Sequence, residues 1–135
     1  MHIIVCLDEN NGMCFAGRRQ SMDSALRVRL LALTQGSRLW MNSYSGKQFA
    51  LQAEHIMVAE DFLKKAGQGE YCFVENTPLG GCEGRLEDVL LCRWNRVYPS
   101  DVKFPMALLT GRHLAETVQF AGNSHDTITL ERYTL

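Results

Sequence analysis

The sequence lacks the features that mark several large classes of protein. It contains no apolar run approaching the ~18 residues that a membrane-spanning helix needs. Basic and acidic residues almost balance, at 14 and 15, so the net charge is only −1. A chain this close to neutral has no general attraction for nucleic acid or for an anionic membrane surface. We therefore expect no nucleic-acid partner and no membrane partner.

Cysteine and histidine are too scattered to predict a metal site. The five cysteines are an odd number, and no two of them have the C-x-x-C spacing. The four histidines occur singly, with no H-x-H or H-E-x-x-H cluster. The N-terminus also lacks the basic segment that opens a signal peptide. We expect no metal site, reduced cysteines and a cytoplasmic location.

The chain is rich enough in apolar residues to form one core. Hydrophobic residues make up 46% of its 135 residues, which is ordinary for a globular protein. Because this length is typical of a single folding unit, we expect residues 1–135 to form one domain.

Short apolar runs alternate with segments of helical character. Residues 3–7 are an almost unbroken apolar run, which is typical of a strand buried on both faces. Leu26, Leu30 and Leu33 then recur at i, i+4 and i+7, and this spacing predicts a helix over residues 24–35. The other predicted elements of this part are strands over 37–44, 55–59, 71–74 and 88–94, a short helix ending at 52 and another over 60–66.

The last part of the chain has the pattern of a β-hairpin. Residues 116–120 and 126–133 alternate between polar and apolar, with Gly122-Asn123 between them. Strands that alternate with helices favour a mostly parallel sheet covered by helices. The expected fold is therefore α/β, a mostly parallel sheet flanked by helices with a C-terminal antiparallel hairpin. Residues 10–21 are expected to form a polar loop.

Asp23 is the sharpest candidate for a site residue. Open α/β sheets bind ligands at the carboxyl ends of their strands, so the loop over residues 10–21 is the first place to look. Asp23 follows this loop and lies at the edge of the apolar helical stripe. It can be a proton donor or ligand anchor with a raised pKa, or simply the N-cap of the helix. The sequence leaves both roles open.

Two further groups of polar residues are weaker candidates. Ser43 and Ser45 open a short helix whose N-terminus can offer backbone N–H groups to an anion. Arg18 and Arg19 can donate hydrogen bonds to an anionic ligand. The alternative for the arginines is a basic loop that only faces water.

Several stretches, taken together in their order, resemble the dihydrofolate reductase family. Residues 4–13 (IVCLDENNGM) are similar to its first strand and the following loop, and residues 38–45 (RLWMNSYS) to the strand that carries its cofactor-phosphate loop. Residues 90–105 and 120–133 are similar to its late strand and its closing hairpin. Asp23 stands where the family keeps its acidic pterin anchor. The resemblance covers most of the chain, and it implies the family's fold and NADPH-dependent pterin reduction.

The chain also departs from the family's pattern where the cofactor binds. The family's Leu-Pro-Trp is absent, and residues 17–21 read GRRQS instead. Asn42-Ser43 replaces the phosphate-loop Gly-Arg, and Glu75-Asn76 replaces the cofactor-binding Gly-Gly. At an effective dielectric constant of about 20, a carboxylate about 4 Å from a pyrophosphate charge costs on the order of 4 kcal/mol. The resemblance therefore implies a divergent, short relative that binds NADPH poorly.

Three functions stay open from the sequence. The first is binding of a small pterin- or nucleotide-like ligand near Asp23, without a cofactor. The second is an NADPH-dependent pterin or folate reductase, in which Asp23 anchors the pterin and helps its protonation. The third is a non-enzymatic scaffold or protein-interaction domain that dimerises or binds a partner through a sheet edge. The candidate catalytic residue is Asp23, and the candidate ligand-binding residues are Cys6, Leu7, Arg18, Arg19, Ser43, Ser45 and Glu75.

Overall fold

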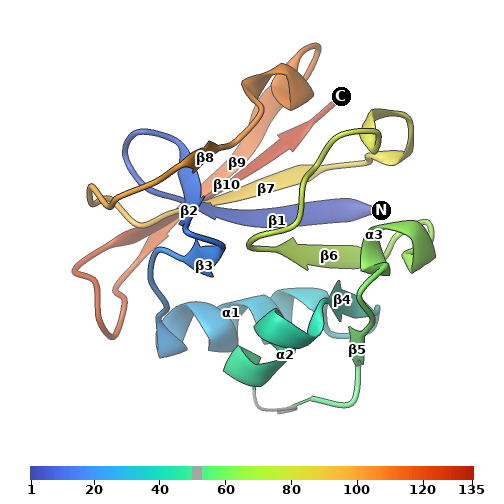
Figure 1. Ribbon diagram of the computed structural model, residues 1–135, viewed down its shortest axis with the longest axis horizontal. Coiled ribbons are helices and arrows are strands. Elements are labelled where there is room, and N and C mark those ends of the chain that lie inside the picture. Colours follow the sequence, from blue (N-terminus) through green and yellow to red (C-terminus); the bar gives the residue numbers. More distant parts are fainter. Residues whose placement is uncertain (50–52) are drawn as a thin grey trace.

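The computed structural model describes residues 1–49 and 53–135, and a seven-stranded sheet runs through this part of the chain (Figure 1). Its strand order is β5-β4-β6-β1-β7-β10-β9. The central strand β1 (His2–Leu7) lies between β6 (Tyr71–Val74) and β7 (Val89–Arg93), and it pairs with both in parallel.

The two ends of the sheet differ in strand direction. On the β6 side, β4 (Leu39–Met41) and β5 (Ile56–Val58) continue the parallel pairing. On the β7 side, β10 (Ile128–Thr134) is antiparallel to β7 and forms a hairpin with the edge strand β9 (His113–Phe120). The expected mostly parallel sheet with a C-terminal antiparallel hairpin is confirmed.

Both faces of β1 are buried, which explains its unbroken apolar sequence. Ile3, Val5 and Leu7 point into one apolar cluster, and Ile4 points into the other. Successive side chains of a strand alternate between its faces, so a strand covered on both sides needs apolar residues at every position. The predicted strand over residues 3–7 is therefore confirmed.

Two helices cover one face of the sheet. The helix α1 (Ser24–Thr34) buries Leu26 and Leu30 in the same cluster as Ile4, and α2 (Ser43–Phe49) contributes Phe49. The face of α1 that carries the regularly spaced leucines is therefore the face that packs against the sheet. The predicted end of the second helix, residues 50–52, lies outside the described residues.

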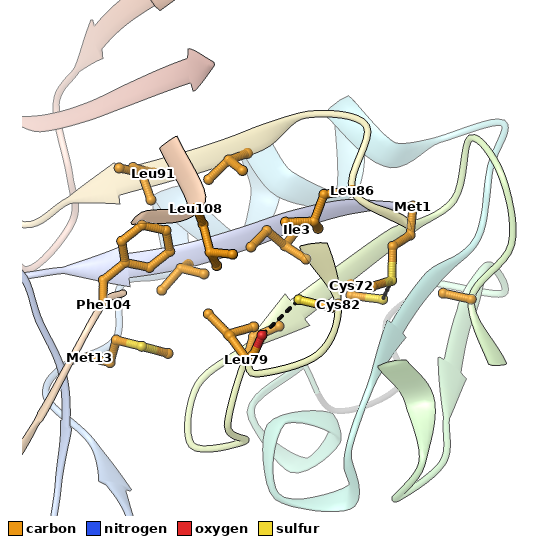
Figure 2. Close-up of a cluster of buried hydrophobic side chains, with 14 of the residues drawn as sticks. Met1, Ile3, Met13, Cys72, Leu79, Cys82, Leu86, Leu91, Phe104 and Leu108 are labelled. Carbon is orange, nitrogen blue, oxygen red and sulfur yellow. Dashed lines mark hydrogen bonds between the residues drawn. The ribbon is translucent and has the colours of Figure 1, made fainter. Parts of the chain in front are cut away.

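The opposite face is covered by short helices and irregular chain (Figure 2). The short helix α3 (Phe62–Lys65) packs there through Phe62. Between β6 and β7 the chain contains a single 3₁₀ turn, η1 (Glu83–Arg85), and it buries Leu79, Cys82 and Leu86 over the sheet. A second turn, η2 (Met106–Leu109), adds Leu108.

The stretch expected to be a polar loop contains a small second sheet. β2 (Gly12–Phe15) pairs with β3 (Arg18–Arg19) and with β8 (Val102–Lys103), both antiparallel. Ala16 and Gly17 join β2 to β3 with positive φ angles of 51° and 74°. Two central residues with positive φ are typical of a tight hairpin turn. The prediction of a loop was wrong for these two strands. Their turn has the sequence Ala16-Gly17, which lacks the Asn-Gly, Asp-Gly or Gly-Gly pair that signals such a hairpin turn.

Two boundaries also differ from expectation. The η2 turn lies just before β9, in a stretch for which no element was predicted, and β9 begins at His113, three residues earlier than predicted. No described helix combines the length and the apolar character that crossing a bilayer requires.

Candidate functional site

Asp23 caps α1 and ties this helix to the hairpin loop between β9 and β10. Its side chain is completely buried. One carboxylate oxygen accepts hydrogen bonds from the backbone N–H groups of Ala25 (2.9 Å) and Asn123 (2.9 Å). The other accepts from the N–H of Ser124 (2.7 Å) and lies 3.0 Å from Nδ1 of His125. A single carboxylate therefore joins two segments about a hundred residues apart in sequence.

These donors control the ionisation of Asp23. Burial raises the pKa of the carboxyl group, but the hydrogen bonds from Asn123, His125, Ser124 and Ala25 together outweigh it and hold the pKa well below its usual range. Of the two roles that the sequence left open, the helix cap is present, and the pKa is lowered rather than raised. A carboxylate that stays ionised and fully bonded within the protein is poorly suited to donate a proton.

His125 extends this network toward the carboxyl end of the sheet. His125 is 4% exposed, and its ring stacks on Trp94 at a centroid distance of 4.5 Å. Its Nε2 lies 3.1 Å from Oγ of Ser21 and 2.9 Å from the hydroxyl of Tyr98. With Nδ1–H directed at Asp23, Nε2 is the acceptor for these two hydroxyl groups.

Glu75 forms a second buried network with Arg19. Nε and Nη2 of Arg19 donate to the two carboxylate oxygens of Glu75 at 2.9 and 3.1 Å. The same oxygens accept from Oγ of Ser45 (2.8 Å) and Nε2 of Gln48 (3.1 Å). The Arg19 guanidinium also lies 4.2 Å from the centre of the Tyr44 ring. The space beyond the end of β6 is thus filled by a bidentate ion pair and its hydrogen-bond partners.

A hydrogen bond from the residue after Glu75 holds the β2–β3 turn. Nδ2 of Asn76 donates to the carbonyl oxygen of Gly17 at 2.9 Å. The other predicted anion-binding groups lie in different settings: Arg18 is exposed, and the N–H of Ser43 donates to a carboxylate oxygen of Glu60 at 2.9 Å. Of the predicted ligand contacts, Arg19, Ser45 and Glu75 are brought together, whereas Arg18 and Ser43 are not bonded to this group.

A narrow crevice separates the two networks, between the carboxyl ends of β1 and β6. Its volume is about 10 Å³, which is the space that one water molecule needs. Among the described residues, Oε1 of Gln20 is the buried side-chain polar atom that has no hydrogen-bond partner. Leu7 is fully buried in the core instead. The residues that line the crevice are Cys6, Met13, Arg19, Gln20, Ser21, Val74, Glu75 and Trp94.

A wider hollow of about 400 Å³ lies beside α3, and two of its charged side chains, Glu60 and Arg85, are bonded to backbone groups. The Arg85 guanidinium donates to the carbonyl oxygens of Leu63 and Ala66, and Glu60 accepts from Ser43. Within residues 1–49 and 53–135, no three histidine, cysteine or acidic side chains are grouped to hold a metal ion.

Comparison with solved structures identifies the architecture. A dihydrofolate reductase from Enterococcus faecalis, complexed with NADP(H) and RAB-propyl, matches with a TM-score of 0.68 over 98% of this chain and 94% of that one. The chain has the dihydrofolate reductase fold. The two sequences are only 13% identical, so the likeness shows this fold alone. No protein-family model matches the chain, and no curated protein matches it.

Within the dihydrofolate reductase fold, sequence reasoning missed the role of His125. A lone histidine is usually a structural group, and no local pattern links it to an aspartate 102 positions earlier. The Gly122-Asn123 turn was the one signal in the sequence that pointed to this network. A tight turn leaves backbone N–H groups free to donate hydrogen bonds to a buried carboxylate. Ser21, at the end of the expected loop over residues 10–21, lies beside His125.

Proposed function

We propose that this protein binds a small planar polar ligand, of the pterin or nucleobase type, in the crevice between β1 and β6, and that it does so without NADPH. The observation that carries the proposal is the unpartnered Oε1 of Gln20. A buried oxygen without a partner costs about 1–3 kcal/mol, and a ligand N–H group would remove that cost. Pterins and nucleobases present such N–H groups along one edge of a flat ring.

The setting of the crevice supports the same class of ligand. It lies at the carboxyl ends of two adjacent parallel strands, where the chain connections diverge to opposite sides of the sheet. Cys6, Met13, Val74 and Trp94 give it an apolar lining, which suits the faces of a planar ring. Asp23 contributes by holding the loop between β9 and β10, with His125, in place and not by contact with the ligand.

Ligand entry requires the β2–β3 hairpin to move, because the closed crevice has room for one water molecule only. The hairpin is held by the Arg19–Glu75 ion pair and by the bond from Asn76 to Gly17. In this proposal the hairpin acts as a cover that opens when these contacts break.

A thermal-shift screen with pterin, guanine and adenosine tests the proposal. A ligand at about 100 times its Kd stabilises the native state by about 2.7 kcal/mol, which raises Tm by several degrees. Gln20→Met removes the acceptor and should abolish the shift, whereas Gln119→Met on exposed β9 should leave it intact. No shift with any of the three compounds, or equal shifts in both variants, would refute the proposal.

NADPH-dependent reduction is the less favoured alternative. It requires a negatively charged pyrophosphate to displace Glu75 from its four hydrogen bonds with Arg19, Ser45 and Gln48. The displaced carboxylate would then repel the cofactor at close range. We expect Glu75→Gly to bind NADPH more tightly than the native protein in the same thermal-shift assay, because this variant removes the repulsion.

A scaffold role rests on a different observation, the exposed edge strand β9. Six of its eight residues are exposed, and Glu116 is the one acidic or basic residue among them apart from His113. Long edge strands with little charge favour pairing with another strand. Sedimentation at increasing protein concentration tests this role, and a constant monomer mass would exclude self-association through β9.

A further inference from the structure

Ser21, His125 and Asp23 lie in a single chain of hydrogen bonds. Oγ of Ser21 is 3.1 Å from Nε2 of His125, and Nδ1 of His125 is 3.0 Å from a carboxylate oxygen of Asp23. A serine, an imidazole and a buried carboxylate bonded in this order are the groups that activate a serine nucleophile in unrelated folds. We propose that Ser21 is a nucleophile activated by His125, and that the crevice hydrolyses small carboxylic esters.

The carboxylate is well placed to orient the imidazole. Asp23 is buried and held by backbone N–H groups of Asn123 and Ser124, so its oxygen has a fixed position. This oxygen accepts a hydrogen bond from Nδ1–H of His125, which leaves the lone pair of Nε2 free to accept a hydrogen bond from Ser21. Stacking on Trp94 fixes the plane of the ring. Orientation of the base by a buried acid is the role that an aspartate has in such a triad.

Tyr98 adds a hydrogen-bond donor at the same point. Its hydroxyl lies 2.9 Å from Nε2 of His125 and 3.4 Å from Oγ of Ser21. At rest, the hydroxyls of Ser21 and Tyr98 share one acceptor. When an ester occupies the crevice, the Tyr98 hydroxyl can turn to donate to the carbonyl oxygen as negative charge develops on it. Its backbone N–H is bonded to Asp8 at 3.0 Å, which positions the residue.

The chemical steps balance without a cofactor. Oγ of Ser21 forms a bond to the ester carbonyl carbon while its proton moves to Nε2 of His125. The tetrahedral intermediate then breaks the carbon–oxygen bond to the leaving group, which takes the proton from His125 and departs as an alcohol. Water attacks the acyl-serine, His125 takes its proton and returns it to Oγ of Ser21, and a carboxylic acid is released.

The small size of the crevice limits the acyl group. With a closed volume of about 10 Å³ and an apolar lining from Cys6, Met13 and Val74, it suits an acetyl-sized group after a modest outward movement of the β2–β3 hairpin. This inference shares the crevice with the proposed ligand site but does not depend on binding of a pterin or nucleobase. Covalent labelling of Ser21 tests the nucleophile, and the thermal shift that depends on Gln20 tests binding of the pterin or nucleobase.

Labelling with methanesulfonyl fluoride, whose sulfonyl group is close to an acetyl group in size, followed by intact-mass and peptide analysis, tests the nucleophile. We expect one sulfonyl group per chain, located on Ser21, together with slow turnover of p-nitrophenyl acetate. Ser21→Ala should abolish both, and the matched variant Ser37→Ala, whose hydroxyl donates to Gly69 at the other end of the sheet, should change neither. Absence of the label from Ser21 in the native protein would overturn the proposal.

A second variant tests activation by His125 through the reactivity of a thiol at position 21. Ser21→Cys places a thiol beside Nε2, and a thiol paired with an imidazole reacts as a thiolate. The native thiols offer a slow background, since burial raises the pKa of Cys14 and Cys82 and raises that of Cys72 to about 12. At about pH 6.5, we expect the introduced thiol to react with iodoacetamide at least tenfold faster than any native thiol. Equal rates, or a fast rate that survives the additional change His125→Gln, would show that His125 does not activate this position.

Discussion

Replacing Asp23 with asparagine should cost far more stability than removal of an ordinary helix cap. The asparagine oxygen can keep the bonds from Ala25 and Asn123, but its NH₂ group then faces two donors, the N–H of Ser124 and Nδ1–H of His125. Hydrogen bonds to a charged group contribute about 1.5–3 kcal/mol each, and the histidine can recover one bond by changing its tautomer. We expect a loss of about 3 kcal/mol, which corresponds to a fall in Tm of about 10 °C for a chain of this size.

Urea unfolding followed by tryptophan fluorescence and circular dichroism measures this loss. The matched control is Asp61→Asn, because Asp61 caps α3 without any side-chain hydrogen bond to it. We expect the control to change stability by less than about 0.5 kcal/mol. A loss of about 1 kcal/mol or less for Asp23→Asn, which is typical of a simple cap, would refute the inference that Asp23 holds the hairpin loop.

The difference in unfolding free energy between the native protein and Asp23→Asn should depend on pH in a defined direction. Because the folded state holds the pKa of Asp23 below its unfolded value of about 3.9, its contribution is complete above that pH. The contribution is lost as the pH falls through the lower pKa of the folded state. The difference in stability between native protein and Asp23→Asn should therefore begin to shrink below about pH 4.

Two further predictions concern the buried ion pair and the hairpin loop. Arg19→Gln and Glu75→Gln should each cost about 3 kcal/mol, because each leaves a largely buried charge without its partner. The double variant should be at least about 2 kcal/mol more stable than additivity predicts, and strict additivity in urea unfolding would contradict the ion pair. Gly122→Ala should cost about 2 kcal/mol, since the new Cβ would lie 2.6 Å from the carbonyl oxygen of His125 and 2.7 Å from Oδ2 of Asp23. Gly80→Ala meets no atom within 4 Å and serves as its control, so equal melting temperatures for the two alanine variants would exclude this close packing.

The parts of the fold that could be predicted from the sequence are those whose residues respond to local burial. Residues 3–7 are apolar throughout because both faces of β1 are covered, and the leucines of α1 recur at helical spacing because one face is covered. The β2–β3 hairpin gave no such signal. Its strands are four and two residues long, too short for a repeating pattern, and Ala16 occupies a positive φ without any compositional sign.

Single residues of the candidate site could be predicted from the sequence, but the contacts between them could not. The position of Asp23 before the leucine stripe predicted either a helix cap or a site residue, and the family resemblance implied that Glu75 is a charge in the cofactor region. Their partners could not be assigned, because Arg19 lies 56 positions from Glu75, and His125 lies 102 positions from Asp23. Pairing at such separations is set by the tertiary fold, and one sequence contains no record of it.

Titration with NADPH directly tests the proposal that this protein binds its ligand without NADPH. The Arg19–Glu75 ion pair with Ser45 and Gln48 occupies the space beyond β6, so the native protein should show no change in Tm at about 1 mM NADPH. A Kd of about 10 µM would instead stabilise the protein by about 2.7 kcal/mol at that concentration. A saturable rise of several degrees in Tm would contradict this proposal.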